Sequence, residues 1–199
     1  MKQVISLGLA LLLLAGCRSK TEKDPVAYAE NPEHGLRKEL KAGSLDYVVQ
    51  YKPVSYILLR EHIDPGNKQE LQARRKELEG YAWFNISFRV GSTGESPLKY
   101  QAGSLEEYNK RLDYYLNRAA SDMYLVYGKD TLYANSYWFE NGQGLTPQET
   151  IIAGFRLPGS DVSPKEDLHF SFYDQVFKNG ILKTVISRED LAAIPDPGF

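Results

Sequence analysis

The sequence predicts an α+β domain built mainly from an antiparallel β-sheet, with two helices, at about 67–79 and 105–120, packed on that sheet. Several segments alternate apolar and polar residues with a period of two, which is typical of half-buried strands. Short polar turns separate most of these segments, which favours antiparallel pairing. Two further segments carry helix-capping residues at their start. The alternative is a two-sheet β-sandwich decorated by the helices.

The first elements of the folded part are a strand, an undecided run and a helix. Residues 45–51 place apolar or aromatic side chains at every second position, which predicts a strand that ends at Pro53. The apolar run 54–61 is compatible with either type of element. Asn67 has a glutamate three residues later and can cap a helix that runs to about Glu79. This helix has few apolar residues, so we expect it on the surface.

The strongest strand signal covers residues 81–90, which alternate almost without interruption, and we place this strand at the centre of the sheet. A second helix begins at Ser104, where Glu107 completes a capping box. Its apolar residues recur at spacings of three and four and form one stripe: Leu105, Tyr108, Leu112, Tyr115, Leu116 and Ala119. The stripe predicts that this helix packs on the sheet.

The rest of the chain is predicted to be almost entirely strand. Residues 123–127 and 131–139 flank a short glycine-containing loop and predict a hairpin. Further strands are expected at 151–157, 168–172 and 181–187, and a single helical turn follows the last of them. The side chains expected in the core are those on strict alternating or helical stripes: Phe84, Phe88, Leu112, Phe155 and Phe170.

The N-terminus has the layout of a secretory signal peptide. One lysine precedes an apolar run at 4–14, and small residues follow it. The run is too short to span a bilayer, which takes about 20 apolar residues. Leu14-Ala15-Gly16-Cys17 resembles the lipobox of bacterial lipoproteins. The resemblance implies cleavage between Gly16 and Cys17 and acylation of the Cys17 thiol.

This resemblance also implies an organisation and a location. We expect a signal peptide at 1–16, a lipidated flexible linker at 17–43 and a single globular domain at 44–199. The residues after Cys17 lack the second-position aspartate associated with inner-membrane retention, so we expect the outer membrane of the cell envelope, with the leaflet left open. The mature domain resembles uncharacterised Gram-negative envelope lipoproteins in style only, which implies no activity.

Composition excludes several classes of protein. The chain has 24 Lys and Arg against 26 Asp and Glu, and this near balance argues against a nucleic-acid partner. It has one cysteine, so a thiol used for lipid attachment leaves none for disulfides. After removal of the signal peptide the length suits one domain.

No motif for catalysis or metal binding is recognisable. The histidines His34, His62 and His169 lack partners at metal-ligand spacing, so we expect no metal and no cofactor. Four carboxylates gather in the sequence around the strand at 168–172 and are interpreted as parts of solvated loops: Asp161, Glu166, Asp167 and Asp174.

The unusual feature of the composition is its 14 tyrosines. In the strand at 131–139, strict alternation puts Tyr133 and Tyr137 on one face and Trp138 on the other. These three residues are our candidate binding contacts, because exposed aromatic side chains stack on sugar rings or bury at protein interfaces. The competing interpretation is that they are half-buried sheet aromatics. Asp130-Thr131-Leu132 resembles a short bacterial O-glycosylation acceptor, which would place the glycan on Thr131.

Three functions remain open from the sequence. The first hypothesis is a lipid-anchored, non-enzymatic domain that binds a partner in the envelope. The second is an accessory lipoprotein that binds a glycan or another nutrient through an aromatic face. The third is a hydrolase whose catalytic residues are distant in sequence. A flat exposed aromatic strip would favour a binding protein, whereas a deep pocket with convergent polar groups would favour an enzyme.

Overall fold

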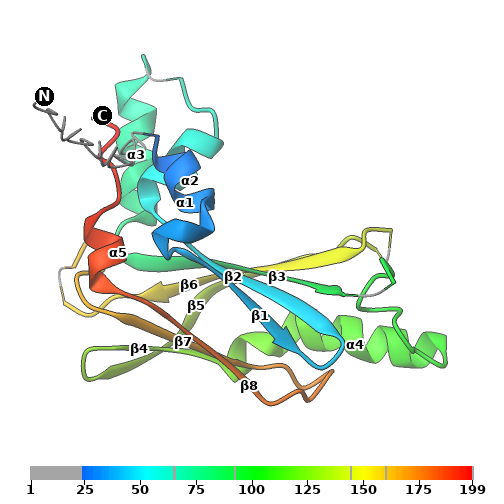
Figure 1. The fold of residues 1–199 in the computed structure, drawn as a ribbon. Coiled ribbons are helices and arrows are strands. Elements are labelled where there is room, and N and C mark those ends of the chain that lie inside the picture. The colour runs from blue at the N-terminus through cyan, green and yellow to red at the C-terminus, as the bar shows by residue number, and fades with distance from the viewer. Residues whose placement is uncertain (1–23, 65, 92, 144, 160, 199) are drawn as a thin grey trace, which may run out of the picture.

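The computed structural model describes residues 24–198 with the exception of residues 65, 92, 144 and 160 (Figure 1). The predicted signal peptide at 1–16 and the predicted lipid attachment at Cys17 therefore lie outside the described residues. Within the described part, the helices are all too short or too polar to cross a membrane.

The core of the fold is one continuous antiparallel sheet of eight strands, in the order β1-β2-β3-β6-β5-β4-β7-β8. The strands are β1 (Arg37–Ala42), β2 (Leu45–Lys52), β3 (Tyr81–Val90), β4 (Met123–Tyr127), β5 (Asp130–Glu140), β6 (Gln148–Arg156), β7 (Leu168–Tyr173) and β8 (Ile181–Ile186). This architecture confirms a mainly antiparallel α+β fold. The sheet is not divided into the two layers of the alternative sandwich.

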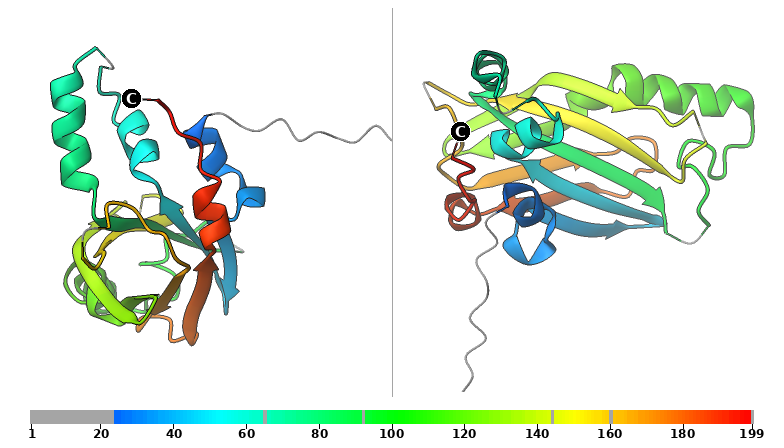
Figure 2. Two further views of the ribbon diagram at one scale, coloured as in Figure 1. Left: turned by 90° about the vertical axis from the view of Figure 1, so that its left-hand side faces the viewer. Right: turned by 90° about the horizontal axis from the view of Figure 1, so that it is seen from above.

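The sheet curls until its first and last strands approach each other, so that it is nearly barrel-shaped (Figure 2, left). Between β7 and β8, the Asn179 side-chain amide donates a 2.8 Å hydrogen bond to the carbonyl of Ala42 at the end of β1. Each strand therefore has a face towards the enclosed interior and a face outside it.

Aromatic side chains fill the interior. Phe84, Phe155 and Phe170 are each at most 1% exposed, and their ring centroids lie 5.2–6.1 Å apart. Phe88 is also buried, as predicted, whereas Leu112 is only partly buried. Because the interior is occupied by packed rings, a ligand site is to be sought on the outside of the sheet.

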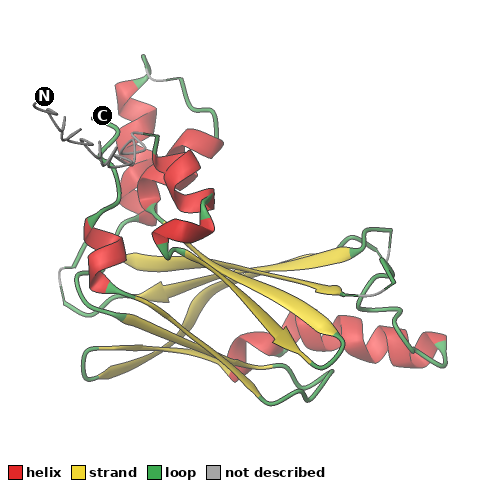
Figure 3. Ribbon diagram, in the orientation of Figure 1, coloured by secondary structure: helices red, strands yellow, loops and turns green. Residues whose placement is uncertain are grey.

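The helices lie at two places outside the sheet (Figure 3). Helices α1 (Pro25–Glu30), α2 (Val54–Arg60), α3 (Lys68–Leu78) and α5 (Arg188–Ala192) gather at one end, and α4 (Leu105–Asn117) lies at the other. Two short 3-10 helices, η1 (Pro32–His34) and η2 (Ala119–Asp122), follow α1 and α4. The undecided run at 54–61 is therefore helical, and the predicted helix at 67–79 is α3.

Helix α4 packs differently from the predicted stripe. Tyr115 is fully buried, with its ring centroid 5.0 Å from that of Phe88 and 5.2 Å from that of Phe139. In contrast, Leu105 is 74% exposed and Leu116 is 46% exposed, so the predicted burial of these two leucines is wrong. The reason is that α4 inserts a tyrosine into the end of the sheet instead of laying a whole stripe along its surface.

The predicted linker is too long. Residues 25–42 form α1, η1 and β1, and both Ala29 and Leu36 are fully buried. The Gln50 side chain donates a 2.7 Å hydrogen bond to the carbonyl of Ala29, which ties α1 to the outer face of β2. The segment is too short and too polar to show a periodic pattern, so its order depends on contacts with distant residues.

Candidate functional site

A β-bulge in β5 decides where the candidate aromatic residues point. The register between β5 and β6 shifts between Ala134 and Ser136, so strict alternation fails along this strand. As a result, Tyr133 and Trp138 are both exposed, at 63% and 66%. The predicted separation of these two aromatics onto opposite faces is therefore wrong.

Tyr137, the third candidate contact, points inward. Its hydroxyl donates a hydrogen bond to the backbone carbonyl of Tyr115 in α4, and its side chain packs against the core. This position does not suit a ligand contact. Thr131, the candidate glycosylation residue, is exposed at the start of β5.

The registers of four strands place the outward residues in two neighbouring rows across the sheet. The first row runs from β2 to β5 through Lys52, Trp83, Gly154 and Ser136. The second row runs through Gln50, Asn85, Ile152 and Trp138. Trp138 therefore lies directly opposite Ile152 and between the outward positions of Ser136 and Glu140.

Helices α2 and α3 stand over these rows and form a cleft of about 620 Å³, which we call the helix–sheet cleft. Its lining residues come from both helices and from the outer face of four strands: Lys52, Tyr56, Ile57, Arg60, Glu61, Arg74, Glu77, Leu78, Trp83, Asn85, Ser136, Glu140 and Ile152. Trp138 stands at its rim, beside Ile152. The volume falls in the range of about 300–1,000 Å³ that is usual for small-molecule sites.

Trp83 forms an aromatic surface in this cleft. Its indole N–H donates a 3.0 Å hydrogen bond to the carbonyl of Leu78, at the end of α3. The ring lies so close to the backbone of Gly154 that a Cβ at that position would be 2.7 Å from Cζ3 of the indole. The missing side chain at Gly154 is therefore what lets the indole lie against the sheet.

Lys52 brings a buried positive charge to one end of the cleft. The residue is 8% exposed, and its Nζ lies 3.8 Å from the centroid of the Tyr56 ring, a cation–π contact. Across the described part of the chain, no carboxylate forms a salt bridge with this ammonium. Glu30 is its nearest compensating charge, and the Tyr56 hydroxyl donates to that carboxylate at 2.9 Å.

Burial is the main influence on the pKa of Lys52. Loss of hydration lowers the pKa of its ammonium to about 8, with smaller contributions in the same direction from Arg60 and Arg37. Glu30 opposes the change. The lysine is thus still mainly protonated at neutral pH.

The two arginines of the cleft differ in their partners. Arg74 of α3 is neutralised by Glu61 at 2.6 Å and Glu77 at 2.8 Å. Arg60, at the end of α2, is exposed and forms no salt bridge with any residue that the structure describes. Lys52 and Arg60 are consequently two cations without a paired carboxylate on one side of the cleft.

The cleft lacks the close pairing that nucleophilic catalysis requires. Its serine hydroxyl, on Ser136, lies three strands from Lys52, which is about 14 Å. An activated nucleophile and its base lie within about 3 Å of each other. The geometry suits recognition of a ligand rather than acyl transfer.

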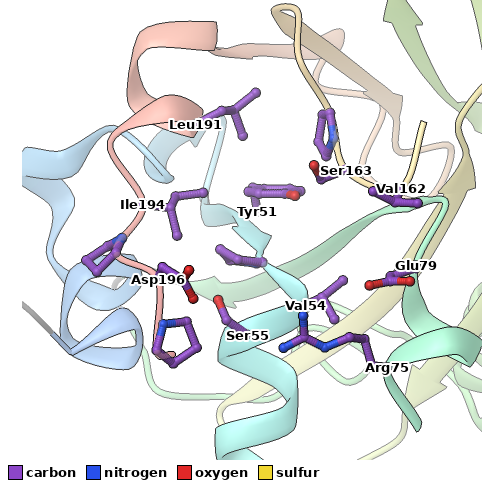
Figure 4. A pocket seen from close by; sticks show the side chains of 14 residues that line it. Tyr51, Val54, Ser55, Arg75, Glu79, Val162, Ser163, Leu191, Ile194 and Asp196 are labelled. Carbon is purple, nitrogen blue, oxygen red and sulfur yellow. The ribbon is translucent and has the colours of Figure 1, made fainter. Parts of the chain in front are cut away.

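A second hollow, which we call the tail pocket, lies between α2, α3 and the C-terminal segment and holds about 310 Å³. Figure 4 shows Tyr51 in the middle of its lining, with Leu191 and Ile194 on one side and Val162 on the other. Its charged lining residues carry both signs: Arg75, Glu79 and Asp196. It has half the volume of the helix–sheet cleft, and among the described residues that line it the only aromatic one, Tyr51, is buried.

Two buried acids were missed by the sequence analysis. Asp174 is 1% exposed, so its interpretation as part of a solvated loop is wrong; it accepts hydrogen bonds from the hydroxyls of Tyr47 and Tyr115 at 2.8 Å each. Glu149 is fully buried and accepts a 2.9 Å hydrogen bond from Ser96. Burial raises the pKa of both carboxyl groups, and both acids are fully bonded parts of the core.

Metal binding finds no support in the described residues, where no three His, Cys, Asp or Glu side chains gather as a metal site would require. The expectation of a metal-free domain stays a prediction. No family model, curated protein or solved structure matches the chain.

Proposed function

We propose that the chain is a lipid-anchored protein of the bacterial cell envelope whose domain binds a small molecule or short glycan in the helix–sheet cleft. The observation that carries this proposal is the combination of two lining residues of the cleft, Trp83 and the buried Lys52, with the exposed Trp138 directly opposite the lining residue Ile152. Aromatic surfaces with a few oriented polar groups are typical of ligand sites. We infer non-covalent binding because the serine hydroxyl of the cleft, on Ser136, lies three strands away from Lys52.

The proposed anchor rests on Leu14-Ala15-Gly16-Cys17. A tether of this kind would hold the binding domain close to the membrane and raise the local concentration of partners there. The anchor has its own test: incorporation of a fatty-acid probe by the wild-type protein, and its loss in Cys17→Ser. Equal labelling of the two proteins would contradict the anchor without bearing on the cleft.

A protein partner on the outer face of β5 is the second candidate function. It is favoured by the exposure of Tyr133 in addition to Trp138, because Tyr133 does not line the cleft. The two residues are separated by about 15 Å along the strand. A partner that covers both would need a broad surface, whereas a ligand of the cleft would touch Trp138 alone.

Variants of Trp138 and Tyr133 therefore distinguish a ligand of the cleft from a protein partner on β5. Trp83 and Trp138 are the two tryptophans of the chain; Trp83 lines the cleft and Trp138 lies opposite the lining residue Ile152, so intrinsic fluorescence reports on this site. We expect a fraction of envelope small molecules and glycans to change the emission saturably. Trp138→Ala should weaken binding at least tenfold, and the matched control Tyr133→Ala should leave the affinity unchanged. Equal losses in both variants would favour the protein partner, and no saturable change would contradict binding in the cleft.

A further inference from the structure

We infer that the ligand of the helix–sheet cleft is an elongated anion, with a carboxylate or phosphate held by Lys52 and Arg60 and a ring-bearing body lying towards Trp138. This inference deepens the proposed function and rests on it. Three features of the cleft carry it: the unpaired cations, the distribution of the acidic residues and the distance between the charged end and the aromatic end.

Lys52 is the first feature. A lysine residue that is more than nine-tenths buried ordinarily has an ion-pair partner, because even partial removal of its charge from water is costly. At Lys52 that partner is absent among the described residues, and the ring of Tyr56 covers one side of the ammonium. An anionic group entering the cleft would supply the missing countercharge.

Arg60 is the second cation at this end. It lines the same cleft as Lys52, from the end of α2, and its positive charge disfavours the charged form of Lys52. Arg74, also in the lining, is already held by two carboxylates and contributes little net charge. Two like charges kept near each other without a shared carboxylate form a site that an anion stabilises.

The acidic residues that line the cleft do not neutralise the positive charges of Lys52 and Arg60. Glu61 and Glu77 are engaged with Arg74. Glu140 lies three strands and two rows away from Lys52, roughly 20 Å across the sheet. Glu30 does not line the cleft, and its carboxylate accepts a hydrogen bond from the Tyr56 hydroxyl. The cation end and the acidic end of the cleft are thus well separated.

The two rows of outward residues across the sheet set the length of ligand that the cleft can hold. From Lys52 the floor passes over Trp83 and Gly154 and reaches Ile152 and Trp138, a distance of roughly 15 Å. Along this path the floor is flat and largely apolar, since Gly154 has no side chain and the Trp83 ring lies over it. A compact anion such as inorganic phosphate would occupy only the Lys52 end, whereas a ring-bearing body would cover the rest.

The test compares 4-biphenylacetate, an elongated ring-bearing carboxylate, with its neutral amide. Binding to the full-length protein is followed through the ¹⁵N-labelled indole N–H signals of Trp83 and Trp138. We expect the acid to bind at least tenfold more tightly than the amide. Lys52→Gln and Arg60→Gln should each reduce that preference for the acid over the amide. Lys183→Gln, an exposed cation of β8, is the matched control and should leave the preference unchanged.

The outcomes separate this inference from the proposed function. Equal binding of acid and amide, with both indole signals shifting, would overturn the anionic ligand and leave the cleft as a binding site. A preference for the acid that survives both Lys52→Gln and Arg60→Gln would also overturn it. Since Arg60 is exposed at a helix end, its replacement keeps the test valid even if Lys52→Gln fails to fold. Indole signals that stay fixed with both probes would contradict ligand binding in the cleft itself.

Discussion

The indole of Trp83 lies against the backbone of Gly154, where a Cβ would come within 2.7 Å of the ring. Because the indole is also fixed by its hydrogen bond to Leu78, it cannot shift without a cost. Gly154→Ala should lower the free energy of unfolding by about 1–3 kcal/mol through overpacking. Urea denaturation measures this loss, and Gly103→Ala, where the nearest atom is 3.8 Å away, is the control that should change little. Equal stability of the two variants would show that the indole does not occupy this position.

Asp174 joins the sheet to α4 through the hydroxyls of Tyr47 and Tyr115. Removing its carboxylate leaves two buried hydroxyls without an acceptor, each worth about 1–3 kcal/mol. We therefore expect Asp174→Ala to lower the free energy of unfolding by at least about 3 kcal/mol, measured by chemical denaturation. Asp122→Ala should cost less, because it removes one of two acceptors of the Tyr114 hydroxyl, which keeps the carbonyl of Tyr173. The reverse order would contradict the central role of Asp174 in the core.

Glu149 gives a pH-dependent prediction. Burial raises the pKa of this carboxyl in the folded state, while hydrogen bonds from Gly142 and Ser96 partly oppose the change. The folded protein thus holds this proton more tightly than the unfolded chain does. Its contribution to stability is complete below the ordinary glutamate pKa of about 4.3 and is lost as pH rises through the folded-state pKa. Glu149→Gln should remove that decline from urea midpoints measured between pH 4 and 7. A variant that declines as steeply as the wild type would refute the assignment.

For Lys52 we expect the opposite dependence of stability on pH. Burial lowers the pKa of its ammonium to about 8, so the unfolded chain binds this proton more tightly. Stability should therefore rise as pH increases from about 8 towards the ordinary lysine value of about 10.4. Lys52→Met should remove this rise and make the protein more stable than the wild type at pH 7. The comparison is made by urea denaturation at pH 7, 8 and 9. A Lys52→Met variant that is less stable at pH 7 would mean that the ammonium has an intramolecular partner.

Period-two alternation and capping residues were enough to predict most of the fold. The strand at 81–90 and the helix that starts after Asn67 lie where the sequence placed them, because their signals are local. The short β1 was not predicted, since its residues are held by pairing with β2 and not by a pattern of their own. The curling of the sheet also depends on contacts between distant strands.

The candidate site was predicted only in part. Trp138 was singled out as an aromatic contact and does lie at the rim of the cleft, but the bulge beside Ser136 reverses the faces that alternation assigns. No sequence pattern marks Lys52 as a site residue, because its burial arises when α2 folds back over the end of β2. A charged residue next to a proline looks like an ordinary strand end until that packing is known.

Hydrogen–deuterium exchange tests the central claim, that the helix–sheet cleft is the binding site, most directly. The full-length protein is compared alone and saturated with the envelope fraction that changes its tryptophan emission. We predict protection in α2, in α3 and in the part of β5 around Trp138, with no change in the C-terminal segment that lines the tail pocket. Protection of that segment or of β7 and β8, with α2 and α3 unchanged, would contradict the account.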